Sequence, residues 1–223
     1  MKISPDDVLL AFRRVQEFLD AHADVLGTVA NGDARKTFDS LVQDGHGHAA
    51  TRNGSATVWL NATKEVGQLR MLLIRDHVHP LTELEHALPQ GAPARSEFRF
   101  RRGESSHEQV YAKAMTIADA VEPHVAVFRT YGMPRHFISN LRAAAEAMID
   151  PLDERMESRR AYDAATKALT SAVRSARSIV RQLDAGVRRA LKDDPVLLGR
   201  WDRVKGLSMR GSKPRKAGLR LVA

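Results

Sequence analysis

A pattern of helices and turns that occurs twice along the chain is the feature that most constrains its fold. Each copy reads as a helix, a tight turn, a second helix, a short break and one long helix. The turns are Asn31-Gly32-Asp33 and Tyr131-Gly132-Met133-Pro134, and the breaks are 52–55 and 150–151. Helices in such units bury their apolar faces only against neighbouring helices, so the repeat favours a helical bundle.

Two interpretations of the repetition are open. In the first, the chain contains duplicated three-helix units over 4–88 and 105–192, joined by a linker over 89–104. In the second, the repetition is only the echo that any up-and-down bundle produces. In both, apolar residues at three- and four-residue spacing predict an all-α fold, an antiparallel bundle of about six main helices over 1–203. A basic, flexible tail is expected over 204–223.

Capping and helix-breaking residues predict where some of the helices begin and end. Ser4-Pro5-Asp6-Asp7 predicts a helix start, because it offers a capping hydroxyl, a proline in the first turn and acids near the positive end of the helix dipole. Pro80 is expected to kink or end the third helix, since proline lacks an N–H and its ring collides with the preceding turn.

The helix expected over 152–192 is the most regular element. Its apolar residues fall on successive a and d positions of a heptad and form a stripe along the helix. Valines at one flanking position make this stripe wider. The a and d residues are Tyr162, Ala165, Leu169, Ala172, Ala176, Ile179, Leu183, Gly186 and Ala190, and the flanking residues are Val173, Val180 and Val187. Most of these side chains are small, so a neighbouring helix can approach closely. A short docking helix that carries Trp201 is expected to follow.

Charge is distributed unevenly along the chain. Residues 158–223 carry 17 Lys and Arg against 5 Asp, a formal charge of +12, whereas residues 1–157 carry −4, which together give the +8 of the whole chain. A mildly acidic body with a strongly basic end is typical of proteins that bind an anionic partner.

Basic residues recur every seven residues on the edge of the long helix opposite its alanines. The candidate binding residues are Arg160, Lys167, Arg174, Arg181 and Arg188, with Arg177 beside them and Lys213, Arg215 and Lys216 in the tail. Such a row suits the phosphate array of nucleic acid, because each neutralised phosphate releases counterions. The competing interpretation is that these side chains solvate an outer face or pair with the protein's own carboxylates. No motif for reading bases is present, and only 5% of the residues are aromatic.

Histidines gather around Pro80. On a helix, His79, Glu83 and His86 share one face, and Glu83-x-x-His86 has the spacing used by di-iron helical bundles. A di-iron site also needs inward-facing glutamates from two further helices, and the apolar faces carry no convincing pair. A metal-binding bundle therefore stays an alternative, and no cofactor or metal ligand is predicted.

The composition excludes several classes of function. The absence of cysteine excludes disulfides, thiolate metal sites and cysteine nucleophiles. The chain has no signal-peptide pattern and no apolar run of roughly 18 residues, so a soluble, cytoplasmic protein is expected. The Gly-x-Ser-x-Gly elbow, the Gly-x-x-x-x-Gly-Lys phosphate loop and the Gly-x-Gly-x-x-Gly fingerprint are all missing, which favours a non-enzymatic protein.

Two segments of the chain resemble sequences from a group of uncharacterised bacterial all-helical proteins. They are Arg75-Asp76-His77-Val78-His79-Pro80-Leu81 and Asp194-Pro195-Val196-Leu197-Leu198-Gly199-Arg200-Trp201. The resemblance covers most of the chain apart from the tail. It implies an all-helical fold and a bacterial cytosolic setting, and it carries no activity.

Three functional classes follow from these patterns. The first is a non-enzymatic protein whose basic C-terminal helix and tail bind an anionic partner, with nucleic acid as the leading candidate. The second is a scaffold or homo-oligomer, in which the alanine-rich seam or Trp201 contacts another helix. The third is a metal-binding bundle that uses His79, Glu83 and His86.

Overall fold

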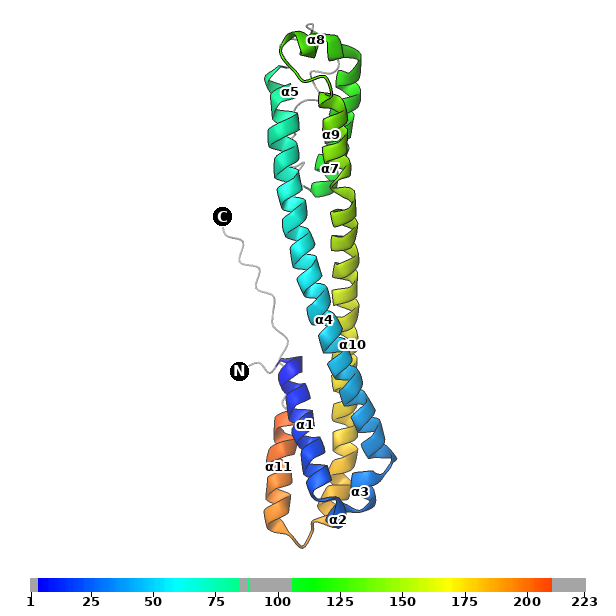
Figure 1. The fold of residues 1–223 in the computed structure, drawn as a ribbon. Coiled ribbons are helices and arrows are strands. Elements are labelled where there is room, and N and C mark those ends of the chain that lie inside the picture. Colours follow the sequence, from blue (N-terminus) through cyan, green and yellow to red (C-terminus); the bar gives the residue numbers. More distant parts are fainter. Residues whose placement is uncertain (1–3, 85–87, 89–105, 210–223) are drawn as a thin grey trace. The chain divides into compact units, whose positions relative to one another are not determined.

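The computed structural model describes residues 4–84, 88 and 106–209, and every regular element in these ranges is helical (Figure 1). The predicted all-α fold is confirmed. The elements are α1 (Pro5–Ala21), α2 (Ala23–Leu26), α3 (Thr28–Asn31), α4 (Asp33–Leu72), the π-helical turn η1 (Leu73–Val78), α5 (His79–Glu83), α7 (His107–Val121), the 3-10 turn η3 (Glu122–His124), α8 (Val125–Thr130), α9 (Phe137–Glu146), α10 (Ile149–Ala190) and α11 (Pro195–Met209). The expected linker 89–104 lies outside the described residues. Among the described helices, none combines the length and the apolar character that crossing a bilayer requires.

The start of α1 is capped as the sequence predicts. The Asp7 backbone N–H donates to the Ser4 hydroxyl at 3.1 Å, and the Ser4 N–H donates to the Asp7 carboxylate at 3.0 Å. These reciprocal bonds satisfy backbone donors that the first turn of a helix otherwise leaves unpaired. The hydrogen bond from the Ser4 N–H also lowers the pKa of Asp7 below its usual value.

The predicted break at 52–55 is wrong, because α4 runs through it without interruption. Gly54 and its neighbours disfavour a helix only weakly: a glycine in a helix interior costs about 1 kcal/mol relative to alanine. Arg52 also has a partner that the local pattern does not reveal, since its guanidinium donates to the Asp6 carboxylate at 2.9 Å. Tertiary contacts thus outweigh a weak local preference.

Pro80 does not end its helix. The wide turn η1 precedes it, in which the His79 N–H donates to the Ile74 carbonyl five residues earlier, and α5 then continues to Glu83. A π-helical turn changes the backbone bonding next to the residue whose N–H is missing. The helix therefore continues past Pro80, because the wider π-helical turn precedes the proline, and it ends one turn later.

The turns of the second half lie close to their predicted places. Gly132 adopts a φ of 89° between α8 and α9, a left-handed conformation that favours glycine. α9 ends at Glu146 and α10 begins at Ile149, so Pro151 lies in the first turn of α10, where a missing N–H is harmless.

The chain divides into two compact units that do not coincide with the two halves of the sequence. Unit 1 comprises Met1–Asn53 with Ala161–Ala223, and unit 2 comprises Gly54–Arg160. Each unit therefore takes part of α4 and part of α10. The duplication of 4–88 and 105–192 stays a prediction. A division of the chain into compact units does not test whether two segments of the sequence share an ancestor.

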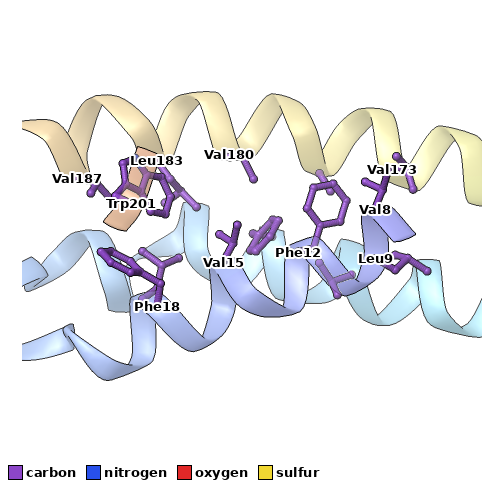
Figure 2. Packing of buried hydrophobic residues seen from close by; sticks show 14 of the residues in the cluster. Val8, Leu9, Phe12, Val15, Phe18, Val173, Val180, Leu183, Val187 and Trp201 are labelled. Atoms are coloured by element: carbon purple, nitrogen blue, oxygen red, sulfur yellow. The ribbon is translucent and has the colours of Figure 1, made fainter. Parts of the chain in front are cut away.

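The core of unit 1 is shared by α1, α4, α10 and α11 (Figure 2). Phe12 packs edge-on against Phe38 of α4, with ring centroids 5.5 Å apart. Phe18 lies 5.4 Å from the ring of Trp201, which is completely buried. α11 consequently lies along α1 and runs in the opposite direction (Figure 1).

The buried stripe of α10 drifts away from the expected heptad. Leu169 is buried as predicted, but at the other end Ala190 is exposed and Leu191 is buried in its place. The buried residues Leu169, Val180 and Leu191 are spaced by eleven residues, or 3.67 per turn, which is close to the 3.6 of an unstrained α-helix. The flanking valines are therefore central to the core. Ala172 and Ala176 of the alanine-rich seam and Trp201 are buried inside unit 1, so these side chains are not available for contact with another protomer.

The core of unit 2 forms between η1, α7, α9 and the adjoining parts of α4 and α10. Its largest fully buried side chains include Leu73, Ile117, Phe128, Leu141 and Met148. His107, the first residue of α7, follows the cap Ser106, whose hydroxyl accepts from the Gln109 N–H at 3.1 Å.

The C-terminal helix is longer than predicted. α11 begins at Pro195 and extends to Met209, so residues 204–209, expected to belong to the tail, are helical. Asp194 caps its first turn by accepting from the Leu197 N–H at 2.9 Å. The helix extends because Trp201 and Ser208 are both buried against the rest of unit 1.

Candidate anion-binding face of α10

The predicted basic residues do not form one continuous row in the structure. Lys167, Arg174 and Arg181 are exposed on the part of α10 that belongs to unit 1. Arg160 is also exposed but belongs to unit 2. The tail candidates Lys213, Arg215 and Lys216 lie outside the described residues.

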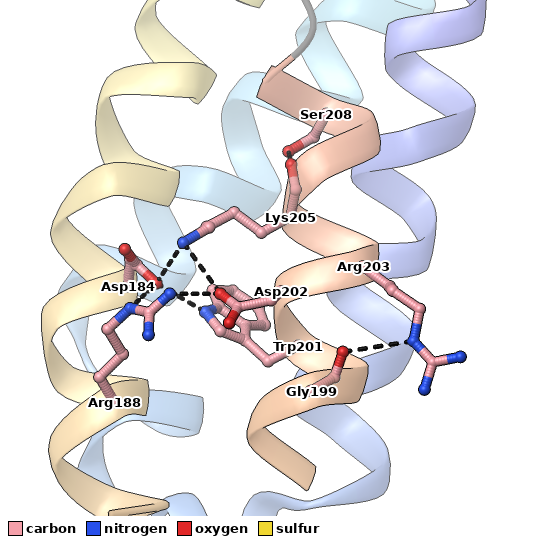
Figure 3. A network of polar contacts seen from close by, with 8 residues as sticks. All are labelled: Asp184, Arg188, Gly199, Trp201, Asp202, Arg203, Lys205 and Ser208. Carbon is pink, nitrogen blue, oxygen red and sulfur yellow. Dashed lines mark hydrogen bonds and ion pairs between the residues drawn. The ribbon is translucent and has the colours of Figure 1, made fainter. Parts of the chain in front are cut away.

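Arg188 is not available in the way the sequence predicted. Its Nε donates to Asp184 at 3.1 Å, and its terminal nitrogen forms an ion pair with Asp202 of α11 (Figure 3). The carboxylate of Asp202 comes from a helix that the sequence pattern did not place next to this arginine. Arg188 therefore belongs to the contact between α10 and α11 and not to a free basic row.

Asp184 is the centre of that contact. One of its oxygens accepts from the Trp201 indole N–H at 2.8 Å, from Lys205 at 2.9 Å and from Arg188 at 3.1 Å (Figure 3). Burial alone would raise the pKa of Asp184, but the hydrogen bonds from Lys205 and Trp201, together with the nearby cations, lower it below its usual value. The network stabilises the docking of α11 and has no chemistry of its own.

Arg177 also contacts α11. Its Nε donates to the carbonyl oxygen of Ser208 at 3.0 Å, near the end of that helix, where a cation is favoured by the helix dipole. Burial lowers the pKa of Arg177, and the charge of Arg181 lowers it further. Arg177 is thus a half-buried cation that has another cation beside it.

Most buried or half-buried arginines of the described chain have carboxylates within reach. Arg35 pairs with Asp20 and Asp39, Arg52 pairs with Asp6, and Arg142 pairs with Asp119 and Glu122. Among the residues that the structure describes, no carboxylate forms an ion pair with Lys167, Arg174 or Arg181. The described carboxylates therefore leave the positive charge of this stretch of α10 unneutralised.

Three of the predicted arginines line one pocket in unit 1. It has a volume of about 310 Å³ and is lined by Pro5, Val8, Thr170, Val173, Arg174, Arg177 and Arg181. The pocket lies between the first turn of α1 and the middle of α10. An apolar wall facing guanidinium groups can hold an oxyanion, because a low-dielectric surface strengthens the attraction between opposite charges.

A second basic depression was missed by the sequence analysis. It has a volume of about 640 Å³ and lies between α1 and α11, where it is lined by Arg14, Glu17, Phe18, His22, Arg200, Arg203 and Val204. Arg200 and Arg203 are three residues apart and therefore share a face of α11. The sequence carries that signal, but it becomes visible only if the helix with Trp201 extends beyond residue 203, where the sequence pattern predicts the end of the bundle.

The structure describes two of the three residues of the histidine cluster around Pro80. His79 and Glu83 lie 3.3 Å apart on α5 and are both exposed, while His86 is outside the described residues. Within the described ranges, no group of three His, Asp or Glu side chains is placed to hold a metal ion.

Comparison with known proteins adds no further assignment, since no protein family, no curated protein and no solved structure matches this chain.

Proposed function

We propose that this protein binds an anionic partner, with nucleic acid as the leading candidate, through the basic face of α10 formed by Lys167, Arg174 and Arg181. The observation that supports this proposal best is that these three exposed cations recur every seven residues on one edge of α10 and form no ion pair with the described carboxylates. Exposed cations without carboxylates repel one another, and a polyanion relieves that repulsion.

The charge of the whole chain supports the same partner. Residues 158–223 carry a formal charge of +12, so the basic face lies on the strongly positive part of the chain. Such a field speeds the encounter with a polyanion and holds it without selecting a sequence. The tail residues Lys213, Arg215 and Lys216 would extend the contact, and a nucleic-acid partner fits the cytoplasmic setting expected from the composition.

The test is the salt dependence of binding to labelled duplex DNA and single-stranded RNA of generic sequence, followed by fluorescence anisotropy. For duplex DNA the logarithm of the association constant falls with the logarithm of salt concentration by about 0.9 per phosphate contacted. Replacing Lys167, Arg174 and Arg181 together by Glu should reduce that slope by about 2 to 3 and weaken binding strongly at about 50 mM salt.

A matched control carries the same change of charge elsewhere. Lys64, Arg129 and Arg135 are exposed in unit 2, and replacing all three by Glu alters the net charge equally. If the control weakens binding as much as the α10 variant, only net charge matters and the assigned face is wrong. If the unaltered protein does not bind either polymer at about 50 mM salt, where phosphate contacts are strongest, the nucleic-acid proposal is wrong.

A further inference from the structure

We propose that the pocket lined by Arg174, Arg177 and Arg181 is a discrete site for a single phosphate group that carries two charges, either inorganic phosphate or the phosphate monoester at the end of a nucleic acid. The proposal deepens the function proposed above and rests on it for the nucleic-acid source. It concerns one enclosed oxyanion site and not the extended face.

The spacing of the arginines brings them together. Residues 174, 177 and 181 are separated by three and four positions, so they follow one edge of α10 over two turns. Thr170 and Val173 continue the same surface one turn earlier, and Pro5 and Val8 of α1 form the facing wall. Guanidinium groups from a single rigid helix thus surround a volume that a second helix closes on one side.

Arg177 is held in place by the fold. Its Nε donates to the Ser208 carbonyl at 3.0 Å, and Ser208 itself is completely buried. This bond fixes the guanidinium plane before any ligand arrives, which lowers the entropy lost on binding. Arg174 and Arg181 are exposed at the rim, where each guanidinium can donate two parallel hydrogen bonds to phosphate oxygens.

A comparison along α10 shows that its arginines differ in whether a carboxylate lies within reach. Seven residues beyond Arg181, Arg188 is paired with both Asp184 and Asp202. Among the described residues, neither Arg174 nor Arg181 has such a partner, although the charge of Arg181 already disfavours the cation at Arg177. A dianion relieves this crowding more than a monoanion does, because attraction scales with the product of the charges.

The size of the pocket limits the ligand. Its volume of about 310 Å³ is at the lower end of the roughly 300–1,000 Å³ of small-molecule sites. A phosphate group with part of its substituent against Val8 and Val173 fits that space.

The experiment uses the full chain and isothermal titration calorimetry with inorganic phosphate at low salt. Saturable binding is expected for the unaltered protein, and the single variants Arg174→Gln and Arg181→Gln should each weaken it at least tenfold. Arg189→Gln is the matched control, because it removes one exposed arginine from the same helix but lies outside the pocket and outside the proposed face. Circular dichroism at each stage confirms that the variants are folded; Arg177 is left unaltered because it also holds α11.

A second arm separates the two sources of phosphate. A short oligonucleotide with a 5′-phosphate is compared with the same oligonucleotide ending in a 5′-hydroxyl. Tighter binding of the phosphorylated end, lost in Arg181→Gln, supports nucleic-acid ends; equal binding of both, with saturable binding of inorganic phosphate, supports free phosphate.

The outcomes also separate this proposal from the proposed function. If neither inorganic phosphate nor the 5′-phosphate is bound specifically, or if Arg189→Gln weakens phosphate binding as much as Arg181→Gln, the pocket proposal is wrong even where long DNA still binds. If phosphate binds in the pocket and long DNA or RNA does not bind at low salt, the pocket stands and the extended face is wrong.

Discussion

The indole N–H of Trp201 donates to the same carboxylate oxygen of Asp184 that accepts from Lys205 and Arg188. The ring of Trp201 is completely buried against Phe18, so one side chain joins α11 to the apolar core through its ring and to α10 through its nitrogen. This relationship makes the position of α11 depend on both packing and polar contacts, and it leads to predictions that separate the two.

Trp201→Phe keeps an aromatic ring in the core and removes the hydrogen bond to Asp184 together with part of the buried indole. We expect it to lower the free energy of unfolding by about 1–2 kcal/mol, because Asp184 retains its other donors and the space left by the smaller ring is limited. Trp201→Ala also removes the ring and should cost about 3–5 kcal/mol. Urea unfolding followed by circular dichroism measures both, with Trp59→Phe in unit 2 as the control. Equal effects of the two Trp201 variants would contradict the separate contribution of the buried ring, and no effect of Trp201→Phe would contradict the role of the nitrogen.

The protein should lose stability at low pH in part because Asp184 becomes protonated. Its pKa is lower in the folded chain than its ordinary value, so the unfolded chain takes up the proton first as pH falls. Its contribution to stability is therefore complete above the unfolded pKa of about 3.9 and is lost as pH drops through the lower folded value. The urea midpoint of Asp184→Asn should change less between pH 5 and pH 3 than that of the unaltered protein. Asp24→Asn, at an exposed carboxylate of α2, should show the unaltered response.

Substitution by alanine should lower the stability of the protein at Gly186 and raise it at Gly54. A Cβ at Gly186 would lie 2.9 Å from a methyl group of Val29, a stiff β-branched side chain, whereas nothing lies within 4 Å of a Cβ at Gly54. Gly54→Ala should stabilise α4 by up to about 1 kcal/mol through helix propensity. Gly186→Ala should destabilise the protein by about 1 kcal/mol, because crowding outweighs that gain. Thermal or urea unfolding measures both changes in stability. Stabilisation by Gly186→Ala would show that α3 can move away from α10 without cost, and it would contradict the prediction.

Arg35 should contribute more to the free energy of unfolding than an exposed arginine does. Its side chain is 9% exposed and donates to Asp39 at 2.8 Å and to Asp20 at 2.9 Å, which ties α4 to α1. Arg35→Ala should cost about 2 kcal/mol, the usual contribution of hydrogen bonds between charged groups. Arg13→Ala removes the exposed pair with Glu17 and should cost less than about 0.5 kcal/mol. Urea unfolding at low and high salt tests both, and a comparable loss in the two variants would contradict the importance of burial.

Much of the local structure could be predicted because it depends on neighbouring residues. The capping box of Ser4 and Asp7, the left-handed turn at Gly132 and the apolar stripe through Leu169 and Leu183 all follow from spacing over a few residues. The break at 52–55 was wrong for the converse reason. Glycine and asparagine lower the helix preference by about 1 kcal/mol or less each, and contacts such as Arg52 with Asp6 decide the outcome.

The candidate site likewise has features that follow from the local sequence and features that depend on distant segments. The sequence alone determined that α10 is a long amphipathic helix with a basic edge, because helical periodicity places Arg174, Arg181 and Arg188 on one side. Only the tertiary structure decided which of these arginines are neutralised: α11 brings Asp202 to Arg188 and the Ser208 carbonyl to Arg177, while α1 brings Pro5 and Val8 to the pocket. Periodicity is a property of adjacent residues, whereas the partner of a charge is set by whichever distant segment folds against it.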